Sequence, residues 1–276
     1  MQKQLKKLCI IAGKGELPRR IIRECHDKQR DVFVISFEGI TDKETTENVE
    51  HQSLHIGKVG KIIKTLRENG IEEVTLAGGV GRPPLSSLSM DFTALKLITK
   101  LAKLPSHGDD KVFSAIIKFL EERNFMVVGA DEILNELLIQ EGPLGSIKPD
   151  KQAERDIKIG VNAALKIGEL DIGQAVVIQQ GQILGVEGAE GTDKLVERCH
   201  ELHNEGPGGV LVKVKKPEQD SRVDLPSIGI YTIENAYKSG LRGIAIEASA
   251  SLVINRKQVI KKANELGVFV TGIIPR

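Results

Sequence analysis

Residues 210–229 concentrate the side chains of this chain that are best suited to chemistry on a phosphate. They read VLVKVKKPEQDSRVDLPSIG, with three lysines before Pro217 and three carboxylates after it. Lysine is a charge partner for phosphate, whereas carboxylates activate water or hold a metal ion. The mixture predicts a site for a phosphate ester, and the alternative is a solvated charged loop that serves solubility.

A strand is needed to position these groups. The apolar run at 210–214 predicts a buried strand that delivers Lys213, Lys215 and Lys216 to the edge of a sheet. Proline has no N–H for the strand ladder, so Pro217 ends the strand. Cations and acids therefore converge at one end of this strand.

Two glycine turns follow apolar segments in the first third of the chain. Residues 8–12 run into Gly13-Lys14-Gly15 and a helical pattern, and residues 73–77 run into Gly78-Gly79. Such glycines let backbone N–H groups approach a phosphate, and the start of a helix adds partial positive charge. In an open parallel sheet both turns would face one crevice at the carboxyl ends of the strands. We expect this crevice to bind substrate through Gly13, Gly15, Glu16, Leu17 and Gly78.

The first turn is also compatible with a nicotinamide-dependent oxidoreductase. Glu38 ends the next predicted strand about twenty residues beyond the glycines, where a dinucleotide fold places its ribose-binding acid. Pro18 occupies the third glycine position of the G-x-G-x-x-G pattern, so the close helix–strand contact of that pattern is not encoded. An NAD(P)-binding oxidoreductase and a non-catalytic nucleotide-binding protein remain alternatives at this point.

Three further sets of residues have both a structural and a functional explanation. Arg82 could meet a phosphate at the second turn or be solvated. Asp109 and Asp110 could contact a ligand or cap the helix that follows them. Thr192 or Asp193 is expected to cap the next helix downstream.

The predicted elements alternate between strand and helix, which is typical of an α/β fold. Strands are expected at 8–12, 32–37, 73–77, 125–128, 175–180, 182–187, 210–214, 243–247 and 268–272. Helices are expected from the first glycine turn to residue 28 and at 58–69, 92–104, 112–123, 153–167, 194–203, 233–239 and 256–266. The first sheet ends near Glu132, and residues 141–150 are the most linker-like segment. We predict a Rossmann-like N-terminal domain at 1–132 and a second α/β domain at 133–276.

The composition excludes several classes of protein. The net charge is +1, aromatic residues make up 3% and tryptophan is absent, which leaves neither a basic field nor a stacking surface for nucleic acid. Cys9, Cys25 and Cys199 lack C-x-x-C spacing, which indicates neither a disulfide framework nor a zinc site and fits a reducing cytoplasm. No apolar run approaches the ~20 residues that span a bilayer, so membrane association is expected to be peripheral.

Five phrases, in this order and at these spacings, resemble the LpxI family of UDP-2,3-diacylglucosamine pyrophosphatases. They are IIAGKGELP at 10–18, HGDD at 107–110, LDIGQ at 170–174, EGTD at 190–193 and RVDLPSIG at 222–229. The resemblance covers nearly the whole chain. It implies that the first domain handles a nucleotide and that the second holds a lipid and catalyses. The implied reaction is the Mg²⁺-dependent cleavage of UDP-2,3-diacylglucosamine to UMP and 2,3-diacylglucosamine 1-phosphate (lipid X), in lipid A biosynthesis.

The resemblance also assigns roles to residues of the second domain. The family's catalytic aspartate corresponds to Asp224 here. We expect Asp224 to position Mg²⁺ or the attacking water, with Asp193 and Glu190 as further metal ligands. A carboxylate ~4 Å from a phosphate oxygen costs roughly 4 kcal/mol of repulsion at a dielectric constant of about 20, so an intervening cation is required. The substrate-binding residues expected in this domain are Gly191, Thr192, Lys213, Lys216 and Gln219.

The expected partners follow from the same resemblance. They are UDP-2,3-diacylglucosamine, lipid X and the membrane surface, with no nucleic acid. We expect a cytoplasmic protein, peripheral on the inner face of the inner membrane. The sequence leaves the oligomeric state open, with a homodimer as one possibility.

Overall fold

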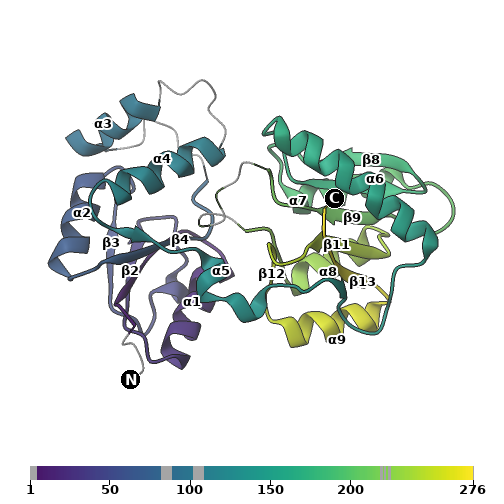
Figure 1. Ribbon diagram of the computed structural model, residues 1–276, viewed down its shortest axis with the longest axis horizontal. Helices are drawn as coiled ribbons and strands as arrows, with labels where there is room; N and C mark the ends of the chain where they lie inside the picture. Colours follow the sequence, from purple (N-terminus) through teal and green to yellow (C-terminus); the bar gives the residue numbers. More distant parts are fainter. Residues whose placement is uncertain are drawn as a thin grey trace. The chain divides into compact units, whose positions relative to one another are not determined.

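The computed structural model describes residues 5–81, 89–101, 109–217, 220, 222 and 225–275 (Figure 1). The chain divides into two compact units. The N-terminal unit contains Met1–Asn135 and Asp220–Asp224, and the C-terminal unit contains Glu136–Gln219 and Leu225–Arg276. Each unit is an α/β structure with its own sheet and core, so the predicted fold class is confirmed.

The N-terminal unit is built on a five-stranded parallel sheet of order β3-β2-β1-β4-β5. Its strands are β1 (Leu8–Ala12), β2 (Val32–Phe37), β3 (His51–Leu54), β4 (Glu73–Ala77) and β5 (Met126–Val127). Its helices are α1 (Glu16–Asp27), η1 (Lys43–Thr45), α2 (Val59–Glu68), α3 (Phe92–Leu101), α4 (Asp109–Glu121) and α5 (Ala130–Ile133). The strand order is Rossmann-like and reverses between β1 and β4, which makes that pair the switch point where such sheets bind ligands.

Burial explains which of these strands the sequence predicts. β1 and β2 are buried at every position, as expected for strands that are covered on both faces. Their sequences are therefore almost entirely apolar, and this pattern allowed both strands to be predicted. β3 was not predicted, because its sequence His-Gln-Ser-Leu is mostly polar. It lies at the edge of the sheet, where its side chains are partly exposed.

The C-terminal unit is built on a six-stranded mixed sheet of order β6-β13-β11-β9-β7-β8. Its strands are β6 (Gly142–Pro143), β7 (Ala175–Gln179), β8 (Gln182–Val186), β9 (Val210–Lys213), β11 (Gly243–Glu247) and β13 (Phe269–Ile273). A separate parallel pair is formed by β10 (Ser227–Ile228) and β12 (Leu252–Val253). Its helices are α6 (Lys151–Glu169), α7 (Thr192–Cys199), η4 (His200–Leu202), α8 (Ile230–Lys238) and α9 (Arg256–Leu266), and η3 (Asn135–Leu137) links the units.

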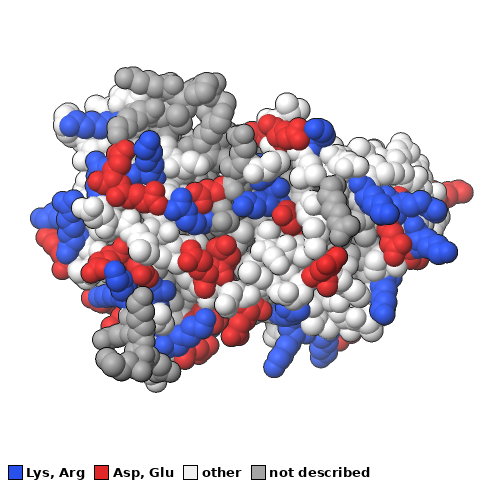
Figure 2. Space-filling model, viewed as in Figure 1, with Lys and Arg blue, Asp and Glu red and all other residues white. Residues whose placement is uncertain are grey.

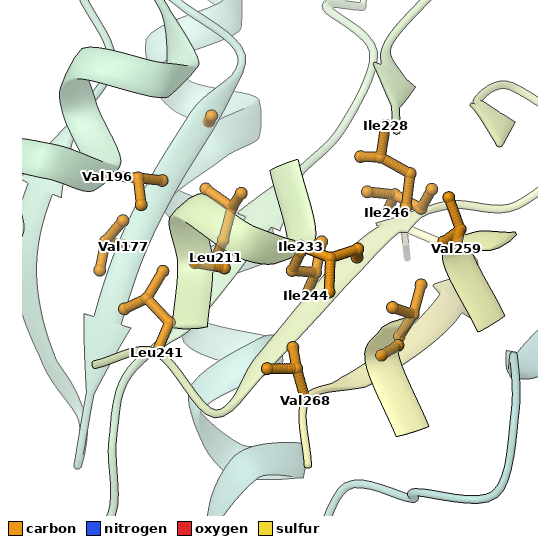
Figure 3. Close-up of a cluster of buried hydrophobic side chains, with 14 of the residues drawn as sticks. Val177, Val196, Leu211, Ile228, Ile233, Leu241, Ile244, Ile246, Val259 and Val268 are labelled. Carbon is orange, nitrogen blue, oxygen red and sulfur yellow. The ribbon is translucent and has the colours of Figure 1, made fainter. Parts of the chain in front are cut away.

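Helices cover both faces of the C-terminal sheet. On one face Leu211 of β9 and Ile244 of β11 pack with Ile233 of α8 and Val259 of α9 (Figure 3). On the other face α6 packs on the same strands. A Cβ on Gly160 of α6 would come within 2.6 Å of the Val212 side chain, so this helix approaches β9 closely. β9 and β11 are thereby packed between two helical layers.

Among the described residues, no helix has the length and apolar character needed to cross a membrane.

Candidate functional site

The two glycine turns of the N-terminal unit lie side by side at the carboxyl ends of β1 and β4. The Lys14 N–H donates to the Gly79 carbonyl at 2.8 Å, and the Gly79 N–H donates to the Lys14 carbonyl at 3.0 Å. The Gly13 N–H donates to the Ala77 carbonyl at 2.8 Å. The turns meet as predicted, but these three N–H groups bind the protein itself.

Glycine is required at these turns because they approach each other closely. A Cβ on Gly13 would lie 2.5 Å from the Gly79 carbonyl oxygen, and one on Gly78 would lie 2.6 Å from the Lys14 carbonyl oxygen. Gly78 also has a φ of 88°, which side chains disfavour. The packing of one turn on the other is therefore a sufficient reason for both glycines.

The start of α1 carries an internal anion. The Gly15 N–H donates to Asp42 Oδ2 at 2.7 Å, and the Arg19 guanidinium lies 3.7 Å from the same oxygen. Glu16 and Leu17 form the first turn of α1. A carboxylate of the protein thus occupies the position that the predicted phosphate would take at this helix.

The same contact disfavours the nicotinamide alternative. Glu38 follows β2 and is exposed, as the ribose-binding acid of a dinucleotide fold would be. A dinucleotide also needs its diphosphate at the start of α1, where Asp42 is bound to Gly15. The chain therefore has the order of strand, glycine turn and helix that a dinucleotide fold requires, but Asp42 occupies the helix start where the diphosphate would bind.

In the C-terminal unit, charged side chains gather where three strands end. Lys213 is the last residue of β9, Glu247 is the last residue of β11, and Glu187 directly follows β8. Strand pairing sets Ala175 of β7 opposite Lys213, and β8 pairs with β7 at the same end, so these positions share one edge of the sheet. We call Glu187, Asp193, Lys213 and Glu247 the charged edge.

Glu187 organises one side of the charged edge. Its buried carboxylate accepts the Gln174 N–H at 2.9 Å and the Thr192 hydroxyl at 2.7 Å. The prediction that Thr192 or Asp193 caps α7 is wrong, because Gly191 is the N-cap, with a φ of 82° and no side-chain hydrogen bond. The Thr192 hydroxyl instead ties the start of α7 to the end of β8.

Asp193 and Lys213 form the centre of the charged edge. Lys213 is 9% exposed, which is unusual for lysine. Burial raises the pKa of Asp193, the Lys213 charge opposes this rise, and Glu197 and Glu187 add to it. The Lys213 charge therefore partly compensates Asp193, and a phosphate that arrives here would compete for the same cation.

Glu247 lies at the neighbouring strand end. It accepts the Lys215 N–H at 2.8 Å. Burial raises the pKa of Glu247, and the Lys215 N–H and the Lys215 charge oppose the rise. Lys216 is differently engaged, since its ammonium lies 2.7 Å from Asp171 Oδ1. Of the two lysines predicted to counter phosphate charge, Lys216 already has a carboxylate partner.

Glu190, a predicted metal ligand, is held by other groups. Arg198 lies 3.0 Å from Glu190 Oε1, and the Gly188 N–H donates to Glu190 Oε2 at 3.1 Å. Its own backbone N–H and Arg198 lower the pKa of Glu190. Within the described parts of the chain, no group of three or more His, Cys, Asp or Glu side chains is arranged to hold a metal ion.

Several predicted site residues lie outside the described residues. These are Arg82, Gln219 and Asp224. Asp109 and Asp110 begin α4, and their side chains are likewise not described. Arg222, two residues before Asp224, is bound by Asp220 at 2.7 Å and by Glu121 of α4 at 2.6 Å. Arg222 thus contacts α4 within the N-terminal unit.

Sequence reasoning missed Glu187, Glu247 and Asp42 as members of these two sites. Glu187 and Glu247 each come at the end of an apolar run, so a search for acids at predicted strand ends would have found both. Asp42 lies in a loop 27 residues from its partner Gly15, and no sequence pattern predicts that contact.

Comparison with known proteins places the whole chain in one family. Residues 7–137 match the LpxI N-terminal domain, and residues 140–271 match the LpxI C-terminal domain. The chain is 37% identical over 278 residues to the UDP-2,3-diacylglucosamine pyrophosphatase LpxI of Caulobacter vibrioides, covering 99% of each protein.

Solved structures add no further argument. A biotin carboxylase domain of a thermophilic 2-oxoglutarate carboxylase is 14% identical with a TM-score of 0.26, covering 62% of this chain and 34% of that one. The biotin carboxylase of Campylobacter jejuni is 12% identical with a TM-score of 0.28, covering 72% and 42%. Both scores are too low to compare folds. The two domain matches and the full-length relative agree, however, and the chain belongs to the LpxI family.

Proposed function

We propose that this chain is a UDP-2,3-diacylglucosamine pyrophosphatase. It hydrolyses the diphosphate of UDP-2,3-diacylglucosamine to UMP and lipid X in lipid A biosynthesis. The observation that carries this proposal is the 37% identity, over 99% of both chains, to the Caulobacter vibrioides protein of that name. The charged edge supports it, because it combines a buried cation with carboxylates at one end of a sheet.

Lys213 is proposed to bind the diphosphate. Lys213 is only 9% exposed as a residue, and a charge near the protein interior interacts more strongly with a ligand than one in bulk solvent. Because β9 is a central strand packed between helices, the position of Lys213 is fixed before the substrate arrives. A cation held in advance stabilises charge that develops on phosphate oxygens without reorganising during the reaction.

Asp224 is proposed as the catalytic carboxylate. The support is its place in the phrase RVDLPSIG and the anchoring of residues on both sides of it. Arg222 forms ion pairs with Asp220 and Glu121, and Leu225 is buried. Asp224 would orient the attacking water toward a phosphorus atom and accept its proton.

Mg²⁺ is the proposed cofactor. This ion takes one or two protein carboxylates together with phosphate oxygens, so a group of three acidic side chains is not required. Asp193 of the C-terminal unit would hold it, and the ion would neutralise charge on the diphosphate. Glu190 is a weaker candidate, because Arg198 already neutralises it.

The division of labour between the domains is also part of the proposal. Residues 1–132 are proposed to handle the nucleotide, and residues 133–276 to hold the lipid and catalyse. The Rossmann-like sheet order supports the first assignment, and the charged edge supports the second. Binding to the membrane surface is proposed because a diacyl substrate resides in bilayers. The cytoplasmic location and the homodimer stay predictions.

The test is hydrolysis of UDP-2,3-diacylglucosamine in detergent micelles, with UMP quantified by chromatography. We expect UMP to appear with Mg²⁺ and to be lost with EDTA. The Asp224→Asn variant should retain substrate binding and lose turnover by about 10²–10³-fold, as is typical for one catalytic electrostatic element. Asp220→Asn is the neighbouring control, and it should stay within a few-fold of the parent because Asp220 pairs with Arg222.

Two results would contradict the proposal. A folded parent that releases no UMP at any Mg²⁺ concentration would remove the activity. Turnover of Asp224→Asn within a few-fold of the parent would remove Asp224 from catalysis while leaving the activity in place.

A further inference from the structure

Helix α3 has apolar side chains on two faces. Ala94 and Leu97 are buried against the core of the N-terminal unit. Phe92 and Leu95, which are 72% and 50% exposed, lie one turn apart on another face. The Lys96 ammonium lies 4.4 Å from the centre of the Phe92 ring. Packing within the unit accounts for the first face, and the second faces solvent.

Helix α2 packs beside α3 and is strongly basic. Four cations and one acid lie between residues 58 and 68. Lys61, Lys64 and Arg67 are exposed, and Lys64 pairs with Glu68 at 3.5 Å. Basic side chains are visible over α2 at the left edge of the space-filling view (Figure 2). The exposed side of α2 therefore carries net positive charge.

The Asp91 carboxylate connects α2 and α3 through hydrogen bonds to the backbone. One carboxylate oxygen accepts the Ala94 N–H at 2.8 Å and caps α3. The other accepts the Gly60 N–H of α2 at 2.7 Å. Both Asp91 oxygens are thus bound to backbone groups at the helix starts, and no ion pair joins Asp91 to a lysine of α2 among the described residues.

We propose that the exposed faces of α2 and α3, defined by Lys61, Lys64, Phe92, Leu95 and Lys96, bind an anionic lipid bilayer. Phenylalanine and leucine enter the boundary between headgroups and acyl chains, and lysines beside them pair with anionic headgroups. Exposed apolar residues on α3, together with the net positive charge of α2, suit this partner better than a neutral protein surface. The inference rests on the proposed function, since a diacyl substrate must be collected from a bilayer.

The test is flotation of the protein with phosphatidylcholine vesicles and with vesicles that also contain phosphatidylglycerol. The parent should float with the anionic vesicles, and less so at high salt, because salt screens exposed charges. Phe92→Ser with Leu95→Ser, and Lys61→Glu with Lys64→Glu, should each weaken partitioning by about tenfold or more.

Matched controls come from the C-terminal unit. Leu202 is 48% exposed, close to the value for Leu95, so Leu202→Ser removes a similar exposed side chain. Lys261 pairs with Glu265 one helical turn away, as Lys64 does with Glu68, so Lys261→Glu makes a similar charge reversal. Both control variants should float like the parent.

Hydrolysis in detergent micelles separates this proposal from the proposed function. The α2 and α3 variants should hydrolyse micellar substrate at the parental rate. If the parent releases no UMP from micelles, the proposed function fails, and flotation still decides the docking surface. A parent that hydrolyses but floats with neither vesicle overturns docking, as do control variants that lose as much binding as the α2 and α3 variants. A third outcome also overturns membrane docking: the parent is dimeric and does not float, whereas the Phe92→Ser/Leu95→Ser variant is monomeric. In that case the exposed face of α3 binds a second copy of the chain.

Discussion

The Asp42 carboxylate accepts the backbone N–H of Gly15 over 2.7 Å, at the N-terminus of α1. A Rossmann-like nucleotide-binding protein holds its diphosphate at the corresponding helix start. A phosphate oxygen ~4 Å from Asp42 would be repelled by roughly 4 kcal/mol at a dielectric constant of about 20. Under the proposed function, we therefore expect the nucleotide either to bind away from the first glycine turn or to displace Asp42 on binding.

Replacing Asp42 separates these two cases. Asp42→Ala leaves the Gly15 N–H without its partner, and we expect a loss of about 1 kcal/mol of unfolding free energy, as for a lost helix cap. If the nucleotide displaces Asp42, UMP should also bind more tightly to this variant in calorimetry. Asp27→Ala, at the other end of α1, is the control and should change neither quantity. An unchanged stability of Asp42→Ala would mean that the contact with Gly15 contributes nothing in solution.

Gly13 and Gly15 should respond differently to an added methyl group. At Gly13 the new Cβ would lie 2.5 Å from a backbone oxygen that cannot move without breaking the turn, so Gly13→Ala should cost about 3 kcal/mol. At Gly15 no atom lies within 4 Å of the new Cβ, and the cost is the backbone strain at a φ of 102° and a ψ of −175°, a region almost restricted to glycine, about 1–2 kcal/mol. Urea unfolding measures both. Equal costs would mean that the two turns do not pack as closely as their hydrogen bonds indicate.

The fold could be predicted largely from the periodicity of apolar residues. The bounds of β1, β2, β4, β11 and α9 agree with their predictions, because buried strands and amphipathic helices have strong patterns. The predicted strand at 125–128 contains β5, but the polar edge strand β3 and the two-residue strands β6, β10 and β12 were missed. These four are defined by pairing with a neighbouring segment, and their own sequences do not indicate a strand. α8 begins at Ile230, before the predicted residue 233.

From the sequence, site residues could be predicted only where a charged side chain stands at the end of a predicted strand. Lys213 stood out because it ends an apolar run. Its burial and its carboxylate neighbours depend on the order of β7, β8 and β9, which the sequence does not state. The engagement of Gly15 by Asp42 and of Lys216 by Asp171 joins residues far apart in the chain. Spacing along the sequence identified reactive side chains and could not tell which of them were already paired.

Glu247 should make stability depend on pH. Burial raises its pKa in the folded state, so the folded protein holds this proton more tightly than the unfolded chain does. The contribution is then complete below the ordinary pKa of 4.5 and is lost as the pH rises through the folded value. Glu247→Gln cannot ionise, and its amide oxygen can still accept the Lys215 N–H. We expect the variant to be more stable than the parent at neutral pH and equal to it below pH 4.5.

Urea unfolding across that pH range measures the effect. Glu201→Gln is the control, because Glu201 is exposed, and its curve should follow that of the parent. A Glu247→Gln variant that is less stable than the parent at neutral pH would mean that the Lys215 contacts outweigh burial.

Lys213 and Lys216 provide the sharpest comparison at the charged edge. The sequence predicts that both counter phosphate charge, but Lys216 is paired with Asp171 at 2.7 Å, whereas Lys213 is buried beside the raised-pKa carboxyl of Asp193. Methionine keeps most of the volume of lysine and removes its charge. Lys213→Met should lower kcat by about 10²–10³-fold with a smaller change in KM, because a fixed buried cation acts mainly on charge that develops in the transition state. Lys216→Met should lower kcat by only a few-fold.

Stability must be measured beside turnover for both variants. Lys213→Met removes the charge that opposes the effect of burial on Asp193, and some loss of unfolding free energy is expected. Turnover is therefore compared in micelles, with saturating Mg²⁺, at a temperature where circular dichroism shows each variant fully folded. Lys213→Arg should recover part of the rate, because it restores the charge. If Lys216→Met loses turnover while Lys213→Met stays within a few-fold of the parent, the phosphate-binding cation is Lys216 and Asp171 orients it.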